Sequence, residues 1–407
     1  MSEKVNKPLN IICLATYFKG VDFIRECKSR GNQVVLVTKE KMLGEDWPRE
    51  SLADLIALPN DADLELFIHL LGLLGRQTQI DRVVALEEFD VITAAQIRDH
   101  FGLPGMSSAI ARLFRDKGAM GAKAREAGVQ VPDFVPLLNY NVIRDFMERV
   151  PPPWIIKPRS DVSAIGIRRV NQEGEVWQAL DEMDSRERLR ERSAHHLLAR
   201  FVAGEVFHVD SVVSNGRVIF AGVNQYGRPP MDVAHKGGAY LSHTVTRGSE
   251  DEKVLLANNR RLVRTLGLKE GAAHAEFIKG AADGTFYFLE IAARVGGAYI
   301  SEVLEASSGV NLWREWARIE LSDGRIRRIT PQRREYAGIV LSLAKQEFPD
   351  TSAYDDAEVV YRVKKKHHAG LIVCSPKLAR VQELLNNYSL RFAGDFAAVM
   401  PPLERAE

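Results

Sequence analysis

Two short stretches decide the fold: His274-Ala275-Glu276-Phe277-Ile278 and Phe286-Tyr287-Phe288-Leu289-Glu290-Ile291. Both are rich in aromatic and β-branched residues, which predicts two strands. The segment between them contains Asp283-Gly284, a pair typical of hairpin turns. The sequence therefore predicts a β-hairpin that carries one glutamate on each strand.

The length of the loop decides where the two glutamates lie. With a three-residue loop and Gly284 in the left-handed conformation, Ala281 pairs with Thr285. Counting outward then pairs Glu276 with Glu290, roughly 5 Å apart at Cβ. Facing carboxylates repel each other, and a bound Mg²⁺ removes that penalty and usually brings substrate phosphates with it. A two-residue loop would place the glutamates on opposite faces, and solvated edge charges are the alternative interpretation.

Size and charge limit the class of protein. The chain has 407 residues, which predicts two or three domains. Its 55 basic and 54 acidic side chains give a net charge of +1, so no global field favours nucleic acid or an anionic membrane. Three scattered cysteines match neither a disulfide framework nor a zinc site. A polar N-terminus and the lack of a membrane-length apolar stretch predict a cytoplasmic protein.

The first hundred residues alternate between strands and helices, which predicts a parallel, doubly wound sheet. The expected elements are strands at 10–15, 34–37 and 82–86 and a helix at 21–30. The first turn lacks G-x-G-x-x-G, so a dinucleotide site is not supported. Glu87, Glu88 and Asp90 follow a strand's carboxyl end, where open sheets bind ligands. They would contact a substrate amine or form an acidic cluster at a helix N-terminus.

Two lysines are candidates for binding phosphate. Lys157 ends the apolar strand 154–157 and precedes a loop of small and hydroxyl residues, although no Walker motif is present. Lys117 follows Asp116 in a segment, 107–127, that has a helical pattern. The alternatives are a snorkelling lysine at a strand end and a solvated helix face.

Three further features complete the candidate site. Residues 199–205 have the character of a connector between two lobes, whose backbone would bind an adenine edge. Glu205 would bind the ribose hydroxyls or, alternatively, be a surface charge at a strand end. Arg294 lies four residues beyond Glu290 and would share its face, where it would hold a carboxylate or, alternatively, pair with Glu290. His274 would orient a carboxylate or lie in the core as a hydrogen-bonded residue.

The order of these motifs resembles the ATP-grasp superfamily. Asp116-Lys117, then "WIIKP" at 154–158, "ARFVAGE" at 199–205 and "HAEF…FLEIAARVGG" at 274–297 carry the resemblance, which covers roughly residues 9–310. The last motif is similar to that of the L-amino-acid ligases. The resemblance implies a mixed α/β and α+β protein in which a doubly wound domain precedes a two-lobed ATP-grasp fold. It also implies an ATP-dependent carboxylate–amine ligase that acts through an acyl phosphate on small amino-acid-like substrates.

The resemblance also implies a role for each candidate residue. ATP phosphates would contact Lys117 and Lys157, and the nucleotide would lie against Arg200, Phe201, Val202 and Glu205. Mg²⁺, for which Mn²⁺ can substitute, would bind Glu276 and Glu290. Arg294 and Lys157 would be the catalytic residues. The implied domains are 1–112 (doubly wound), 113–196 (small lobe), 197–329 (large lobe) and 330–407 (an α+β subdomain with a last helix at 376–387 and a strand at 396–400).

One position departs from the pattern. Many ATP-grasp proteins have Asn two residues after the second glutamate as a further metal ligand, and here that residue is Ala292. Some amino-acid ligases share this departure. It leaves open two other functions, a bicarbonate-activating carboxylase and a non-catalytic nucleotide-binding regulatory module. Segments 158–166 and 226–244 are expected to close over the site, and a homodimer is an expectation by analogy.

Overall fold

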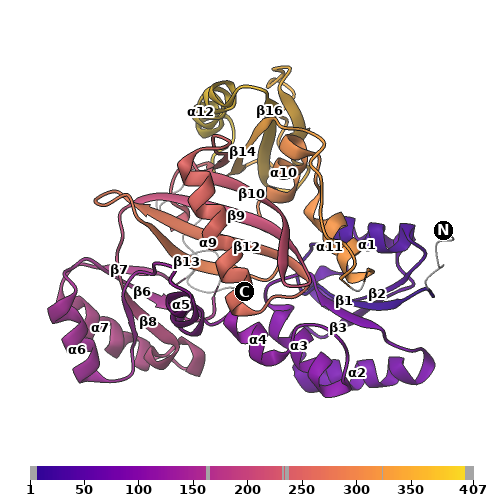
Figure 1. Ribbon diagram of the computed structural model, residues 1–407, viewed down its shortest axis with the longest axis horizontal. Helices are drawn as coiled ribbons and strands as arrows, with labels where there is room; N and C mark the ends of the chain where they lie inside the picture. Colours follow the sequence, from indigo (N-terminus) through magenta and orange to yellow (C-terminus); the bar gives the residue numbers. More distant parts are fainter. Residues whose placement is uncertain (1–6, 162–165, 232, 234–237, 323, 399–407) are drawn as a thin grey trace.

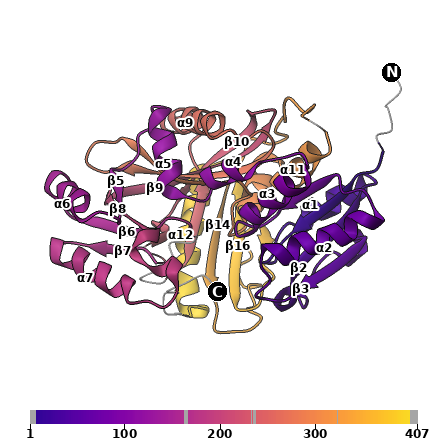
Figure 2. The ribbon, with the colours of Figure 1, turned by 90° about the horizontal axis from the view of Figure 1, so that it is seen from below.

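The computed structural model describes residues 7–161, 166–231, 233, 238–322 and 324–398. Figure 1 shows three parts: an N-terminal domain, a small lobe and a large lobe built on a broad sheet. Figure 2 shows the N-terminal domain and the small lobe at opposite ends, with the large sheet between them. The mixed α/β architecture expected from the sequence is confirmed.

The N-terminal domain is the predicted parallel sheet. Its strands run in the order β3-β2-β1-β4, and all neighbours are parallel. β1, β2 and β4 are mostly buried apolar runs, so helices must cover both faces of this part of the sheet. The bounds are β1 Asn10–Leu14, α1 Val21–Ser29, β2 Gln33–Lys39, β3 Asp54–Leu58, α2 Leu64–Gln77, β4 Arg82–Ala85 and α3 Asp90–Phe101.

Two helices, rather than the single one expected over 107–127, lead to the small lobe. α4 spans Ser108–Leu113 and α5 spans Lys117–Glu126. The prediction of one helix was wrong because Asp116 caps the second helix, accepting hydrogen bonds from the backbone N–H groups of Gly118 and Ala119. The cap fixes Lys117 as the first residue of α5.

The small lobe is an antiparallel sheet with two helices. Its strand order is β5-β8-β6-β7, and its core joins the strands to both helices. The bounds are β5 Phe134–Pro136, α6 Tyr140–Arg149, β6 Trp154–Pro158, β7 Arg168–Val170, α7 Glu173–Asp184 and β8 His196–Arg200. Lys157 therefore lies on β6, as expected.

The large lobe is an eight-stranded sheet in the order β13-β12-β9-β10-β11-β14-β16-β15. Helix α9 packs on one face, and α10 packs on the other. The bounds are β9 Gly204–Ser214, β10 Arg217–Tyr226, β11 Tyr240–Thr244, α9 Glu250–Leu266, β12 Gly271–Gly280, β13 Phe286–Ala292, α10 Ile300–Ser308, α11 Leu312–Glu320, β14 Tyr336–Leu343, β15 Val359–Arg362, β16 His368–Ser375 and α12 Leu378–Asp395.

The C-terminal residues differ from the expected separate subdomain. Strands β14, β15 and β16 continue the large sheet, since β14 pairs with β11. The last helix runs to Asp395 rather than 387, because the buried residues Leu385, Tyr388 and Phe392 extend the helical spacing. Among the described residues, the expected strand at 396–400 is reduced to a single bridge between Ala344 and Ala397.

Candidate active site

The β12–β13 hairpin pairs Glu276 with Glu290, as the sequence predicts. The route to that pairing differs from the expected one. Gly280, rather than Ala281, donates to the carbonyl of Thr285, so the loop is one residue longer. A β-bulge then restores the register, because Phe277 pairs with Phe288 while Glu276 pairs with Glu290. The bulge leaves Leu289 as the extra residue.

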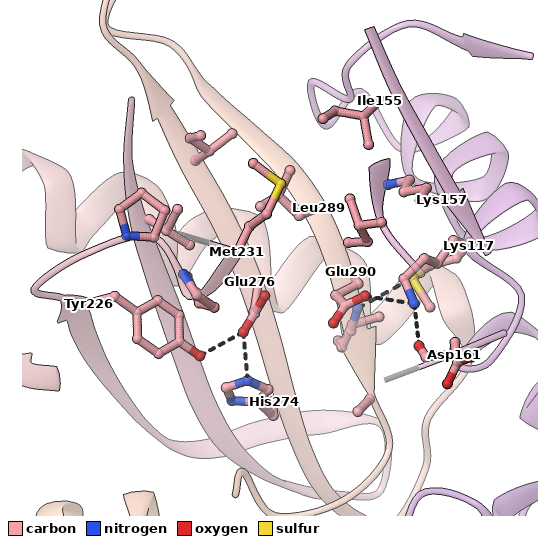
Figure 3. A pocket seen from close by; sticks show the side chains of 18 of the residues that line it. Lys117, Ile155, Lys157, Asp161, Tyr226, Met231, His274, Glu276, Leu289 and Glu290 are labelled. Atoms are coloured by element: carbon pink, nitrogen blue, oxygen red, sulfur yellow. Dashed lines mark hydrogen bonds and ion pairs between the residues drawn. The ribbon is translucent and has the colours of Figure 1, made fainter. Parts of the chain in front are cut away.

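The two glutamates line a cavity of about 750 Å³ to which all three parts of the protein contribute. Figure 3 shows Glu276 and Glu290 side by side on the hairpin, with Lys117 and Lys157 on the small-lobe side. Carboxylates and ammonium groups thus share one cavity although the residues are up to 173 positions apart in the chain, from 117 to 290. The structure brings these four predicted residues together.

The two lysines have different surroundings. Lys117 Nζ lies 2.9 Å from Oε2 of Glu290 and donates to the carbonyl of Asp161 at 2.6 Å. Burial, and then the positive charge of Lys117, lower the pKa of Lys157 to about 8, with Glu290 opposing the shift. Lys157 therefore loses its proton at a lower pH than an ordinary lysine does.

Glu276 is held by two donors on the same oxygen. The Tyr226 hydroxyl donates to Oε1 at 2.6 Å, and Nε2 of His274 lies 3.3 Å from it. Burial alone would raise the pKa of Glu276, but the His274 hydrogen bond and charge hold it below its usual range. The carboxylate therefore stays ionised, as a metal ligand must.

The donor set fits a divalent cation. Bonds to described residues engage Oε1 of Glu276 and Oε2 of Glu290. That leaves one oxygen of each carboxylate available to a hard cation, which prefers such ligands. Glu276 and Glu290 are thus suited to hold Mg²⁺ together.

Arg294 is bound by a glutamate of the N-terminal domain. Its Nε and Nη2 donate to Oε2 of Glu88 at 2.9 and 2.5 Å, and Nη1 donates to the carbonyl of Val295. Arg115 contacts Oε1 of Glu88 at 2.5 Å. Burial opposes ionisation of Glu88, but Arg294 and then Arg115 lower its pKa to about 2. The expected alternative, a pair between Arg294 and Glu290, is not what the structure shows.

Glu88 therefore pairs with two arginines, rather than offering a carboxylate to a substrate amine. Arg294 still lines the cavity. Three of its five N–H groups are used in the bonds above, so two remain to face a bound anion. Of the other acidic residues in this stretch, Glu87 pairs with Lys19 at 2.7 Å. Asp90 accepts from the backbone N–H of Thr16.

The connector between the lobes lies at the other end of the cavity. β8 ends at Arg200 in the small sheet and β9 begins at Gly204 in the large one, so residues 201–203 join the lobes. Arg200, Phe201 and Val202 line the cavity. The guanidinium of Arg169 lies 4.4 Å from the centre of the Phe201 ring. These residues provide the apolar and backbone groups expected of an adenine site.

Glu205 is not brought to the site. It is exposed, whereas its neighbours Gly204 and Val206 line the cavity. Since successive side chains of a strand point to opposite faces, Glu205 on β9 points away from the nucleotide side. The expected ribose contact is therefore not supported. Of the segments expected to close over the site, 162–165, 232 and 234–237 lie outside the described residues.

The comparisons with known proteins agree with this geometry. A family model described as the ATP-grasp domain matches residues 150–302. Over these residues the chain is similar to ATP-grasp proteins. An L-arginine-specific L-amino acid ligase of Bacillus subtilis is 22% identical over 264 residues, which are 64% of this chain and 63% of that protein. The match thus spans less than two thirds of that relative's length.

Solved structures share the fold over nearly the whole chain. An L-amino acid ligase from Bacillus licheniformis has a TM-score of 0.73 at 17% identity, covering 97% of this chain and 99% of that one. N5-carboxyaminoimidazole synthetase from Staphylococcus aureus has a TM-score of 0.71 at 13% identity, covering 95% and 97%. Among the described residues, no helix has the length and apolar character that crossing a bilayer requires.

Several contacts of the site were not predicted from the sequence. Tyr226 on β10 binds Glu276, whereas Asp210 on β9 binds His274 and His208 binds Asp210. Glu88 was predicted to contact a substrate amine, and its pairing with Arg294, 206 positions away, was not predicted. One signal was present. His208-Val-Asp210 and His274-Ala-Glu276 both place a histidine and a carboxylate two residues apart, which puts each pair on one face of a strand.

Proposed function

We propose that this protein is an ATP-grasp enzyme, an ATP-dependent carboxylate–amine ligase that joins small amino-acid-like substrates through an acyl phosphate. The observation that carries the proposal is the cavity in which facing glutamates, two lysines and an arginine meet. Phosphoryl transfer needs this kind of positioning and charge neutralisation, with little covalent chemistry from the protein. The similarity to an L-arginine-specific ligase and to a second L-amino acid ligase supports an amino acid as substrate.

The residues of the hairpin and of the small lobe would bind the nucleotide. Residues 200–202 would hold the base, and Lys117 and Lys157 would bind phosphate oxygens. Glu276 and Glu290 would hold Mg²⁺, or Mn²⁺ in its place, which supplies neutralisation of phosphate charge. Lys117 already contacts Glu290, so nucleotide and metal would bind as a linked pair.

Arg294 would serve the acid substrate. Transfer of the γ-phosphoryl group to a carboxylate oxygen gives an acyl phosphate and ADP. The amine then attacks the acyl carbon, phosphate leaves, and the amine gives up a proton as the amide forms. The two N–H groups that Arg294 has left can bind the oxygens on which negative charge develops. The walls of the cavity would exclude water, which otherwise hydrolyses the acyl phosphate.

A screen of amino-acid pairs tests this proposal. Purified protein with Mg·ATP should release phosphate only when both an acid and an amine are present, and mass spectrometry should find the condensed product. Glu290→Gln should abolish release while leaving the thermal unfolding temperature within a few degrees of wild type, since it removes one charge and keeps the shape. Unchanged release by this variant would refute the metal role.

The same assay separates the other two functions. Release of phosphate that requires bicarbonate and no amino acid would indicate a carboxylase. Nucleotide binding in calorimetry without turnover for any substrate pair would indicate a regulatory module, the function that Ala292 favours. Either result would replace the ligase proposal.

A further inference from the structure

Behind the two glutamates, β9 and β12 carry a buried polar cluster. His208 and Asp210 are two residues apart on β9, and His274 and Glu276 are two residues apart on β12. The register pairs His274 with Asp210 and Glu276 with His208. Directly paired residues share a face of the sheet, so all four side chains lie on the face that lines the cavity.

Asp210 is the centre of the cluster. Its Oδ2 lies 2.5 Å from Nδ1 of His208, and its Oδ1 lies 2.8 Å from Nδ1 of His274. Nε2 of His208 lies 2.8 Å from the hydroxyl of Ser242. Asp210 and His208 are fully buried, and His274 is 7% exposed. The segment before α10 closes the cluster, since a Cβ on Gly296 would lie only 2.8 Å from Oδ1 of Asp210.

The cluster has the ligand types of a metal site but is already complete without one. His208, Asp210 and His274 could in principle surround an ion. The atoms that such an ion would need, however, are bonded to one another at hydrogen-bond distance. The second nitrogen of His274 leads out of the cluster to Oε1 of Glu276. The hydrogen-bond chain therefore ends at the glutamate pair.

The buried carboxylate of Asp210 is stabilised by its two histidines, and one of them orients Glu276. Burying a charge is unfavourable unless every lone pair is bonded. Here both oxygens of Asp210 hold histidines, and His274 in turn binds the same oxygen of Glu276 that Tyr226 binds. The other oxygen of Glu276 is thereby left to face the cavity. His274 also pairs directly with Ala292, the position at which many ATP-grasp proteins place a further metal ligand.

We propose that Asp210 is a positioning residue for the divalent cation: it holds His274, which engages Oε1 of Glu276, so that Oε2 would remain free to bind the cation. The fixed carboxylate makes up for the ligand that Ala292 does not supply. This inference rests on the proposed function in one respect, namely that Glu276 binds the cation. Outer partners of this kind typically change metal affinity by about 10- to 100-fold when they are replaced.

Binding of Mn²⁺, measured by electron paramagnetic resonance with a non-hydrolysable ATP analogue, tests the inference without turnover. Asp210→Asn keeps the shape of the side chain but presents a donor to one histidine. We expect its Kd for Mn²⁺ to rise about tenfold or more. The control is Asp356→Asn, which removes a carboxylate that holds Arg380 and Tyr388 far from the site and should leave the Kd within twofold.

A second pair of variants keeps the inference testable if Asp210→Asn does not fold. In His274→Asn the amide can replace Nδ1 and keep the bond to Asp210, but it is too short to reach Glu276. It should weaken Mn²⁺ binding as Asp210→Asn does. His274→Gln, which can still reach Glu276, should retain more of the affinity. Wild-type affinity in both Asp210→Asn and His274→Asn would overturn the inference.

The experiment also separates this inference from the proposed function. Wild-type protein that binds no Mn²⁺ with the nucleotide analogue would refute the metal role of Glu276 and thus both proposals. Wild-type protein that binds Mn²⁺, with variants that bind it equally well, would refute only the role of Asp210. Tight binding with the expected loss in the variants, but no ligation, would refute only the ligase.

Discussion

The charge of Lys157 should make nucleotide binding depend on pH. Burial beside Lys117 lowers the pKa of Lys157 to about 8 from an ordinary value of 10.5. The ammonium form is the one that binds phosphate oxygens. Nucleotide affinity should therefore fall as the pH rises through 8, the range in which most lysines are still fully charged.

The size of the effect follows from the titration. With a pKa of about 8, roughly nine in ten molecules carry the ammonium at pH 7 and roughly one in ten at pH 9. If only the charged form binds, the Kd rises about tenfold over that range. The stability of the free protein should change in the opposite direction. Between about pH 8 and 10.5 the unfolded chain keeps a proton that folded Lys157 has lost, so this group favours folding more as the pH rises.

Calorimetry with ADP or a non-hydrolysable ATP analogue between pH 7 and 9 measures the effect. Lys157→Arg should remove most of the dependence, because a guanidinium does not titrate in this range. Lys123→Arg, on an exposed part of α5, should behave as wild type and reports the titration of the nucleotide itself. Equal Kd values for wild-type protein at pH 7 and 9, with weaker binding by Lys157→Met, would refute the reasoning.

Two further predictions concern residues that the structure reassigns. Glu88→Gln leaves Arg294 and Arg115 buried without their charge partner, so it should cost about 3 kcal/mol and lower the unfolding temperature by several degrees. As the control, Glu50→Gln, which breaks the exposed pair with Arg25, should cost under about 1 kcal/mol; equal shifts of the unfolding temperature in the two variants would contradict the burial argument. Glu205→Ala should change nucleotide affinity less than twofold, whereas Phe201→Ala should weaken it about tenfold. A large loss of affinity with Glu205→Ala would show that Glu205 does contact the ribose.

The pairing of Glu276 with Glu290 could be predicted from the local sequence of the hairpin, but the details of its loop could not. Their pairing was predicted correctly from a three-residue loop, yet the loop is longer and a bulge at Leu289 compensates. The loop is one residue longer than predicted, and the bulge adds one residue to β13, so the two differences cancel in the pairing of the glutamates. The helix boundary at Asp116 was also within reach, because an aspartate before a helix is a common cap.

Other features depend on contacts between distant segments and had no local signal. Glu205 follows its motif in sequence, but strand alternation at β9 turns it outward. The partner of Arg294 lies 206 residues away, in another domain. The local sequence of residues 330–407 predicted a separate subdomain. The pairing of β14 with β11, which joins these strands to the large sheet, involves residues far apart in the chain.

The ion network around Glu88 links the N-terminal domain to the cavity. Glu88 follows β4, Arg115 precedes α5, and Arg294 follows β13, so each comes from a different part of the fold. Glu88 and the carbonyl of Val295 together fix the planar guanidinium of Arg294, because Glu88 binds two of its nitrogens and Val295 binds the third. Loss of Glu88 would therefore release the guanidinium of Arg294, whereas the hydrogen bonds of Glu276 and the ion pair of Glu290 do not involve Glu88. Under the proposed function, in which Arg294 binds the acid, substitutions at Glu88 should therefore impair activation of the acid more than binding of the nucleotide.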